Sequence, residues 1–428
     1  MKPIKVGLLG LGTVGTGVVR IVEGHQEDLV MQTGSPLKIE KVLVKDRSKA
    51  RNISVSEDKL TEDPWEIIYN EDIDVVVEVM GGIEPAKTYI LEALARGKHV
   101  VTANKDLMAL HGQEILAKAA DKSCDVFYEA SVAGGIPIIR TLIEGFASDR
   151  ITKIMGIVNG TTNYILTKMS QEGVSYEEVL KEAQQLGYAE ADPTSDVEGL
   201  DAARKMTILA TLGFNVQVSL DDVSVRGISS ISKEDILYGQ KLGYEVKLLG
   251  IAECRDDSIS VTVQPTMVKK SHPLASVNGV FNAVYVYGEA VGETMFYGPG
   301  AGELPTATSI VADLVAVAKN QNLGVSGRRL FTPYKEKKLK SDEQVDYKNF
   351  ILLHVEDDPG VLAKIAKVFA EHEVSLESVL QQPNPHNPKA EIIIITHDAN
   401  QASMKKVLED FQTLDVVHKV KSVYRVEG

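Results

Sequence analysis

The first third of the chain alternates short apolar runs with stretches whose apolar residues recur at helical spacing. The runs have the length of buried strands, and the stretches between them are long enough for helices. The expected strands are residues 4–9, 39–44, 74–79 and 99–102. The expected helices include residues 85–96 and 107–120. Strands that alternate with helices predict an α/β fold with a parallel, doubly wound sheet.

A glycine-rich segment, GLGTVG at residues 10–15, joins the first expected strand to an expected helix. This order of strand, motif and helix is a signature of dinucleotide binding. Gly10 should make the tight turn, Gly12 should let the backbone approach a pyrophosphate, and Gly15 should let the helix pack closely. The expected cofactor contacts in this turn are Gly10, Gly12, Thr13, Val14 and Gly15. Residues 1–130 are therefore predicted to form a Rossmann-type dinucleotide-binding domain.

The residues after the second expected strand bear on the choice between NAD and NADP. A site specific for NAD usually has an acidic residue there, which binds the ribose 2′-hydroxyl. In this chain Lys45 and Arg47 flank Asp46. The two cations favour a 2′-phosphate, and thus NADP with Lys45 as a contact, whereas Asp46 leaves NAD open. Two cations in a loop also fit a solvated turn without any role in binding.

Lys105 follows the expected strand at residues 99–102 and precedes the next expected helix. Ligands of open α/β sheets bind at the carboxyl ends of the strands, so Lys105 is placed where a nicotinamide ring and its substrate would meet. A surface lysine ahead of a helix is the alternative. Lys105 is therefore a candidate both for catalysis and for cofactor binding.

The segment from residue 190 to residue 205 holds five acidic residues and ends in a basic pair. An expected helix over residues 199–212 places Asp201 and Lys205 on one face together with apolar residues. Such a pair is expected to be partly buried, and buried Lys and Asp need a partner or a purpose. Lys205 is therefore a candidate catalytic residue, and an ordinary ion pair four positions apart is the alternative. Upstream, the polar cluster NGTTN at residues 159–163 should cap a helix and line a site.

The middle and the end of the chain are expected to hold two further domains. Residues 131–300 combine expected strands, hairpins and helices, which suggests an α+β domain for substrate binding and dimerisation. A glycine loop ending at Gly302 and a long helix should return to the cofactor, so residues 300–325 complete the first domain. Polar residues 326–348 indicate a linker, and residues 349–428 show the strand-helix-strand-strand-helix-strand order of a ferredoxin-like fold. The linker predicts a catalytic part that folds without this last domain.

Composition excludes several classes of function. The chain of 428 residues has a net charge of −14 and a sequence pI of about 5.2. No basic face or arm stands out, which argues against nucleic-acid binding. No apolar run reaches the roughly 18 residues that a membrane span requires, and no signal peptide precedes the first strand. Cys124 and Cys254 lie far apart, without the spacing of a metal site, as expected in a reducing cytoplasm.

Several segments, taken in order, resemble the homoserine dehydrogenase family. They are GLGTVG at residues 10–15, TANK at 102–105, residues 129–137, NGTTNYIL at 159–166, GYAEADP at 187–193 and DAARK at 201–205. The resemblance covers about residues 1–325 and implies reversible, NAD(P)-dependent reduction of aspartate semialdehyde to homoserine, on the route to threonine, isoleucine and methionine. The turn DDPGVL at 357–362 resembles an ACT domain, a regulatory module for small molecules. No kinase segment precedes the dehydrogenase, which implies the monofunctional form.

The resemblance also implies roles for individual residues. Glu190 and Asp201 would bind the amino end of the substrate, and Lys105 and Lys205 would be the acid–base candidates. A monovalent cation, with Na⁺ the first choice, would bind main-chain carbonyls of a small-residue loop. The carbonyls are those of Glu129, Val132, Gly134 and Ile136. We further expect a homodimer or homotetramer and an amino-acid effector at the ACT domain, threonine being the first choice.

Two other functions stay open on the sequence alone. One is another Rossmann oxidoreductase, acting on an amino-acid aldehyde or a saccharopine-type substrate. The other is a non-catalytic sensor whose domains only bind metabolites, although both Lys105 and Lys205 stand in intact motifs, which argues against it. An ACT-like domain that only pairs subunits is a further alternative.

Overall fold

The computed structural model describes residues 2–327, 331–383 and 389–428. Its contacts divide the chain into two compact units. Unit 1 comprises Met1–Val158, Arg204–Asp221 and Phe281–Glu336, and unit 2 comprises Asn159–Ala203, Asp222–Val280 and Lys337–Gly428. The units therefore cut across the predicted domain boundaries. Within the described residues, no helix is long and apolar enough to cross a membrane.

Unit 1 contains a six-stranded sheet in which all strands pair in parallel. The strands are β1 (Ile4–Leu9), β2 (Leu37–Leu43), β3 (Leu60–Thr61), β4 (Val75–Glu78), β5 (His99–Thr102) and β6 (Val126–Phe127). Their order is β3-β2-β1-β4-β5-β6, the strand order of dinucleotide-binding sheets. The prediction of a Rossmann-type domain is thus confirmed, with strand ends that differ from the expected ones by one or two residues.

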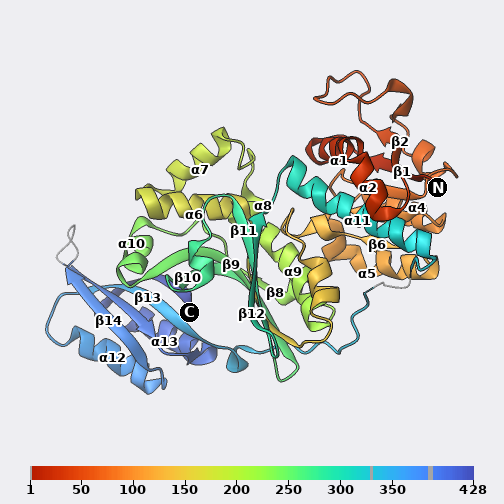
Figure 1. Ribbon diagram of the computed structural model, residues 1–428. Helices are drawn as coiled ribbons and strands as arrows, with labels where there is room; N and C mark the ends of the chain where they lie inside the picture. Colours follow the sequence, from red (N-terminus) through yellow and green to blue (C-terminus); the bar gives the residue numbers. More distant parts are fainter. Residues whose placement is uncertain (1, 328–330, 384–388) are drawn as a thin grey trace. The chain divides into compact units, whose positions relative to one another are not determined.

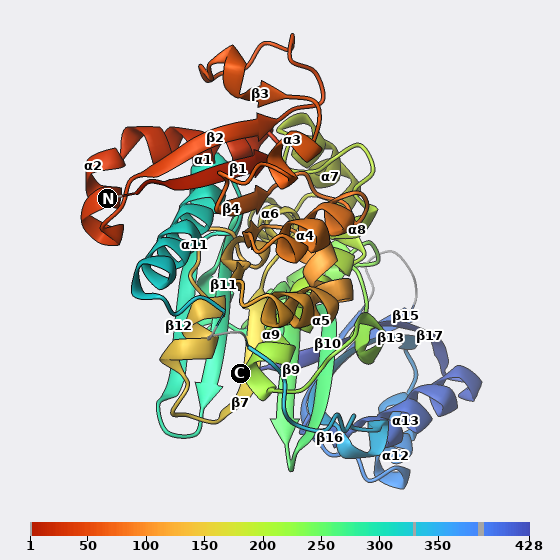
Figure 2. The same cartoon turned by 90° about the vertical axis from the view of Figure 1, so that its right-hand side faces the viewer.

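The helices of this domain come from both ends of unit 1. They are α1 (Thr13–Gly24), α2 (Gln26–Thr33), α3 (Trp65–Ile68), α4 (Ala86–Ala95), α5 (Lys105–Asp121) and α11 (Glu303–Leu323). Helices α1 and α11 lie side by side (Figures 1 and 2), and a Cβ atom on Gly17 would lie 2.6 Å from the Glu303 carbonyl oxygen. Ala307, Ile310 and Leu314 join the core formed by β1 and α1. The segment at residues 300–325 therefore packs on the first domain, as expected.

Three antiparallel strands and most of a further helix complete unit 1. They are β7 (Ile151–Ile157), β11 (Phe281–Gly288), β12 (Gly292–Pro299) and α9 (Leu200–Phe214), whose first four residues belong to unit 2. Strands β11 and β12 form one of the hairpins expected within residues 131–300. Between β6 and β7, residues 139–140 are helical and continue into the π-helical turn Thr141–Gly145.

Unit 2 begins with helices and a long hairpin. Its first elements are α6 (Gly160–Glu172), α7 (Tyr176–Gln185), α8 (Thr194–Val197), β8 (Val223–Val225), α10 (Lys233–Lys241), β9 (Tyr244–Arg255) and β10 (Ser258–Lys269). Strands β9 and β10 pair in antiparallel fashion. Asp256 and Asp257 form the turn between them with positive φ angles, which Asp tolerates better than most residues. The expected hairpin is confirmed.

The end of the chain has the predicted ferredoxin-like order. Its elements are β13 (Asp346–Glu356), α12 (Val361–Glu371), β14 (Leu376–Pro383), β15 (Lys389–Thr396), β16 (Ala399–Asn400), α13 (Gln401–Thr413) and β17 (Val417–Glu427). The strands β17-β13-β15-β14 form an antiparallel sheet. Helices α12 and α13 pack against it (Figure 1), with the rings of Phe369 and Phe411 in contact in the core.

This last domain is joined to the rest of unit 2 by its C-terminal strand. Strand β17 pairs in parallel with β10, so that β9-β10-β17-β13-β15-β14 is one continuous run of strands. Arg425 on β17 is 3% exposed, and its guanidinium lies 3.0 Å from Glu253 on β9. The predicted linker is also held in place, because Leu339 forms a β-bridge with Ile259. The sheet of this domain therefore continues that of the preceding hairpin. That the catalytic part folds without the last domain stays a prediction.

Candidate active site

The glycine turn after β1 has the geometry of a phosphate-binding loop. Gly10 has a φ of +112°, and a Cβ atom there would lie 3.1 Å from the Val79 carbonyl oxygen. A Cβ atom on Gly15 would lie 2.2 Å from the Gly10 carbonyl oxygen, so α1 approaches the turn as closely as a glycine permits. At Gly12, the N-cap of α1, a Cβ atom would meet nothing within 4 Å. The helix N-terminus is therefore open to a bound anion.

In the loop after β2, two of the three charged residues at positions 45–47 form hydrogen bonds with neighbouring residues of the chain. The carboxylate of Asp46 accepts hydrogen bonds from the Ser48 amide (2.8 Å) and hydroxyl (2.6 Å), and these bonds lower the pKa of Asp46. The guanidinium of Arg47 donates to the Glu57 carbonyl at 2.9 Å. Lys45 is exposed. Lys45 is thus the cation best placed to reach a ligand in solution, whereas Arg47 stabilises the loop.

The carboxyl ends of β4 and β5 are tied together by a buried acid that the sequence analysis did not single out. The Glu78 carboxylate accepts from the Met80 amide at 2.8 Å and from the Thr102 hydroxyl at 2.6 Å. Asn104 caps α5 by accepting from the Leu107 amide at 3.1 Å. The sequence offers one signal for Glu78, an acidic residue within an apolar run. Because a fully buried acid needs hydrogen-bond partners, this position could have been predicted to organise the strand ends.

Lys105 and Lys205 both belong to unit 1, on different helices. Lys105 is the half-buried first residue of α5, at the carboxyl end of β5. Lys205 lies on α9, and its Nζ donates to the Val158 carbonyl at 2.7 Å. The preceding residue, Arg204, forms an ion pair with Asp106, with Nε 2.5 Å from Oδ1. The two helices that carry the lysines are therefore joined directly beside them.

Asp201 is buried within unit 2, where it accepts a hydrogen bond from Asn159. The sequence predicted Asn159 only as a member of the polar segment NGTTN. The Asn159 side-chain amide donates to Asp201 Oδ2 at 2.8 Å and to Asp196 Oδ1 at 2.7 Å. Its carbonyl oxygen accepts from the Thr162 amide, which caps α6 as predicted. Asn159 therefore fixes two carboxylates at the N-terminus of α6.

Glu190, the other predicted substrate contact, lies at a different depth from Asp201. It is exposed on the loop between α7 and α8, and its main-chain carbonyl accepts from the Gln184 side chain at 3.1 Å. Asp201 is 5% exposed. One predicted carboxylate is thus accessible to solvent, and the other is positioned from within the fold.

The small-residue loop after β6 is buried and tightly turned. Ala133 and Gly134 have consecutive left-handed φ angles of 55° and 50°. Three of the four predicted carbonyls already accept a hydrogen bond. The Glu129 carbonyl accepts from the Val132 amide (3.5 Å), the Gly134 carbonyl from the Ser309 hydroxyl (2.7 Å), and the Ile136 carbonyl from the Ile138 amide (2.8 Å). A carbonyl oxygen has two lone pairs, so each can still bind a cation. Among the described residues, no cluster of His, Cys, Asp or Glu side chains is arranged to hold a metal ion.

Two buried carboxyl groups support this loop. The Glu129 side chain accepts from the main-chain amides of Ile139 (2.7 Å) and Arg140 (2.8 Å). Asp313 on α11 accepts from the Glu129 amide at 2.9 Å and pairs with Arg140 at 2.7 Å. Burial, and then the Glu129 charge, raise the pKa of Asp313 to about 8. Gly302, with a φ of +126°, is the N-cap of the same helix α11.

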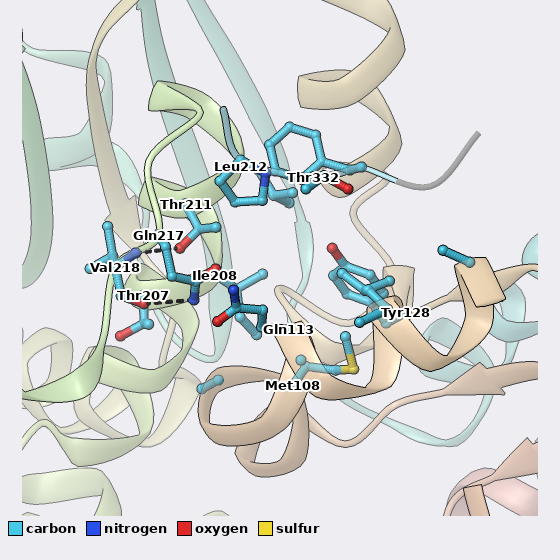
Figure 3. A pocket seen from close by; sticks show the side chains of 17 residues that line it. Met108, Gln113, Tyr128, Thr207, Ile208, Thr211, Leu212, Gln217, Val218 and Thr332 are labelled. Atoms are coloured by element: carbon cyan, nitrogen blue, oxygen red, sulfur yellow. Dashed lines mark hydrogen bonds between the residues drawn. The ribbon is translucent and has the colours of Figure 1, made fainter. Parts of the chain in front are cut away.

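A cavity of about 180 Å³ separates α5 from α9 within unit 1. Met108 and Gln113 line it from α5, and Thr207, Ile208 and Leu212 line it from α9 (Figure 3). The two helices are therefore not packed tightly against each other along this stretch.

Family models match most of the chain. A model of the homoserine dehydrogenase NAD-binding domain matches residues 10–129, and a homoserine dehydrogenase model matches residues 137–315. An ACT-domain model matches residues 350–416. The homoserine dehydrogenase of Bacillus subtilis (strain 168) is 58% identical over 429 residues, which cover 100% of this chain and 99% of that protein. The chain belongs to the homoserine dehydrogenase family.

Solved structures lead to the same conclusion. A homoserine dehydrogenase from Thiobacillus denitrificans matches with a TM-score of 0.95 at 40% identity, over 100% of this chain and 99% of that one. A hyperthermophilic archaeal homoserine dehydrogenase in complex with NADPH matches with a TM-score of 0.61 at 26% identity, over 74% of this chain and 98% of that one. The chain is accordingly an NAD(P)-dependent oxidoreductase, which interconverts homoserine and aspartate semialdehyde in the biosynthesis of threonine, isoleucine and methionine.

Proposed function

We propose that Lys105 and Lys205 provide the acid–base chemistry of this homoserine dehydrogenase. When bound, the nicotinamide supplies or accepts the hydride at C4 of the substrate. The substrate hydroxyl loses a proton during oxidation and regains it during reduction, and a positioned amine can accept and return that proton. The observation that carries the proposal is the hydrogen bond from Lys205 to the Val158 carbonyl. This bond fixes the amine at the residue that directly precedes the polar segment NGTTN.

The amino end of the substrate is assigned to Asp201 and Glu190. A buried carboxylate that already has a donor in Asn159 keeps further lone pairs for an ammonium group. Glu190 would supply the second negative charge from the exposed loop between α7 and α8. These two negative charges would bind the ammonium group by charge-assisted hydrogen bonds.

The acid–base assignment is tested with Lys205→Met and Lys105→Met, assayed by reduction of NADP⁺ with homoserine. We expect at least one of the two to lower kcat by about 10²–10⁴-fold, the usual size of an acid–base contribution. Lys87→Met is a matched control, because Lys87 on α4 pairs with Glu114, nine residues beyond Lys105 on α5, and the change should leave kcat unchanged. Activity within tenfold of wild type in both lysine variants would refute the assignment.

We further propose NADP as the preferred cofactor, held by the glycine turn at Gly10, Gly12 and Gly15 and by Lys45. The open N-terminus of α1 supports pyrophosphate binding there. The archaeal relative solved with NADPH supports the choice of cofactor class. Lys45→Met should raise KM for NADP⁺ by about tenfold more than KM for NAD⁺, since a charge-assisted phosphate contact is lost. An equal effect on the two cofactors would exclude a 2′-phosphate contact by Lys45.

A monovalent cation, Na⁺ being the first choice, is proposed for the carbonyls of Glu129, Val132, Gly134 and Ile136. The burial of this loop and its two left-handed residues support a cage of main-chain oxygens. The cation would fix the loop electrostatically and carry out no step of the reaction. A rise in the thermal midpoint with NaCl but not with choline chloride at equal ionic strength is expected. The same rise with both salts would count against a specific site.

The ACT domain is proposed to bind an amino-acid effector, with threonine the first choice, in a cytoplasmic homodimer or homotetramer. The turn before α12 supports this, because Gly360 is the N-cap of the helix with a φ of +94°, and helix N-termini favour anions such as a carboxylate. Threonine should inhibit the enzyme and bind with a stoichiometry of one per chain or per chain pair. Inhibition that is purely competitive with homoserine would instead place threonine in the active site.

A further inference from the structure

Two oppositely charged residues stand next to the two lysines. Asp106 follows Lys105 in the first turn of α5, and Arg204 precedes Lys205 in α9. Arg204 Nε lies 2.5 Å from Asp106 Oδ1, and the two side chains are 25% and 31% exposed. A partly shielded ion pair thus joins the two helices within one residue of each lysine.

Behind this ion pair the two helices lack close packing. The cavity of about 180 Å³ begins at Met108 on α5 and at Thr207 on α9, two and three residues beyond the charged pair. The labelled side chains of the two helices point into this space (Figure 3). Protein interiors usually fix the distance between helices by filling the space between them. Here the ion pair takes over that task at the end of the helices where the lysines lie.

We propose that Arg204 and Asp106 form a positioning pair, which holds Lys105 and Lys205 at the separation that proton and hydride transfer require. The proposal rests on the acid–base function proposed for these lysines. Consecutive helical residues project about 100° apart, so Arg204 can hold α9 without occupying the position of Lys205. A displacement of about 1 Å at a reacting group can cost roughly 10²-fold in rate.

A purely structural role for Asp106 makes different predictions. An acidic residue in the first turn of a helix stabilises that helix, with or without a partner on another helix. Loss of such a contribution would lower the thermal midpoint and leave kcat intact in the protein that remains folded. A positioning role lowers kcat in protein that is folded and that still binds its cofactor.

The test compares Asp106→Asn with Glu114→Gln. Glu114 lies on α5 like Asp106, and its replacement breaks the 2.8 Å ion pair with Lys87 of α4. We expect Asp106→Asn to lower kcat by about 10–100-fold, with KM for homoserine and the Kd of NADP⁺ within about threefold of wild type. Glu114→Gln should keep wild-type kcat. Wild-type kcat in folded Asp106→Asn would overturn the proposal.

The exchanged variant, Asp106→Arg with Arg204→Asp, keeps the test decisive if Asp106→Asn folds poorly. It restores the pair with reversed polarity, and we expect it to recover at least tenfold in kcat over Arg204→Asp alone, as a double-mutant cycle requires for a direct interaction. An exchanged variant that is no faster than Arg204→Asp would contradict a positioning pair.

A second cycle separates this proposal from the function on which it rests. If Lys205→Met and Lys105→Met both keep wild-type activity, the acid–base assignment fails, and the positioning role fails with it. If Lys205→Met is slow and Asp106→Asn slows it no further, the pair acts through the lysine, because residues that act as a unit are not additive. If Asp106→Asn slows both Lys205→Met and Lys105→Met by its full factor, the assignment of the lysines stands and the positioning role is overturned.

Discussion

Lys247 on β9 is a buried cation that takes no part in the proposed chemistry. It is 2% exposed, and its Nζ donates to the Val277 carbonyl (2.5 Å), the Asn278 side chain (3.0 Å) and the Asn163 side chain (3.4 Å). Burial lowers the pKa of Lys247 from its ordinary value of 10.5 to about 8, although the charge of Glu245 opposes the shift. We predict that this group makes the stability of the protein depend on pH in a specific range.

The sign follows from the direction of the shift. The native state binds this proton less tightly than the unfolded chain, so the charged form of Lys247 destabilises the fold. The cost is complete below pH 8 and disappears as pH rises from about 8 to 10.5. The difference between these two pKa values corresponds to about 3 kcal/mol. Between pH 7.5 and 9.5, wild type should therefore gain about 2 kcal/mol of stability relative to a variant without the amine.

Lys247→Met is the appropriate variant, since it keeps the volume and removes the titrating group. The absolute stability of this variant is a poor test. The substitution removes the cost of burying a charge, but three oxygen atoms lose their hydrogen-bond donor, which costs free energy in the opposite direction. The informative quantity is the difference between the urea midpoints of the variant and wild type, measured at pH 7.5, 8.5 and 9.5. Lys405→Met serves as control, because Lys405 is an exposed lysine on α13. A difference between Lys247→Met and wild type that stays constant over this range would refute the reasoning.

Three further predictions concern other parts of the chain. Asn159→Ala should raise KM for homoserine at least tenfold and lower stability by about 1 kcal/mol, because it removes a helix cap and the donor to Asp201; unchanged kinetics would exclude this carboxylate from the substrate site. Arg425→Met should lower the free energy of unfolding by about 3–5 kcal/mol, since the Glu253 carboxylate loses its buried partner, and a loss below 1 kcal/mol by urea unfolding would contradict this. Burial raises the pKa of the Cys124 thiol to about 11, so iodoacetamide should leave Cys124 unmodified at pH 8, as mass spectrometry can check.

The elements of the Rossmann domain could be predicted because their signals are local. Each strand is an apolar run followed within a few residues by a helix, and Gly10 and Gly15 are required by contacts inside one turn. The expected strand at residues 39–44 is observed as Leu37–Leu43, an offset typical of strand ends, where hydrogen bonding decides the boundary rather than residue type. Local pattern therefore gave the type and order of the elements.

The contacts that build the site could not be predicted in the same way. Asn159 and Asp201 are 42 positions apart, and no pattern within either segment specifies that the amide of one meets the carboxylate of the other. The ion pair between Asp106 and Arg204 likewise depends on how two helices approach each other. Helical spacing predicted that Lys205 lies on a partly buried face. Its partner is the main-chain carbonyl of Val158, and every residue has such a carbonyl, so the sequence could not identify it.

The join between the ACT domain and the hairpin bears directly on how an effector could act. A domain on a flexible linker can influence its neighbour only by docking against it, whereas β17 shares main-chain hydrogen bonds with β10. The same strand carries Tyr424, whose hydroxyl donates to Asp235 of α10 at 3.0 Å. An effector that binds two states of the ACT sheet with different affinity would therefore bias β10 and α10 as well, which is the requirement for allosteric coupling. Removing the domain would expose the edge of β10 and leave the buried Asp235 and the half-buried Glu253 with fewer partners, so inhibition and stability should be lost together.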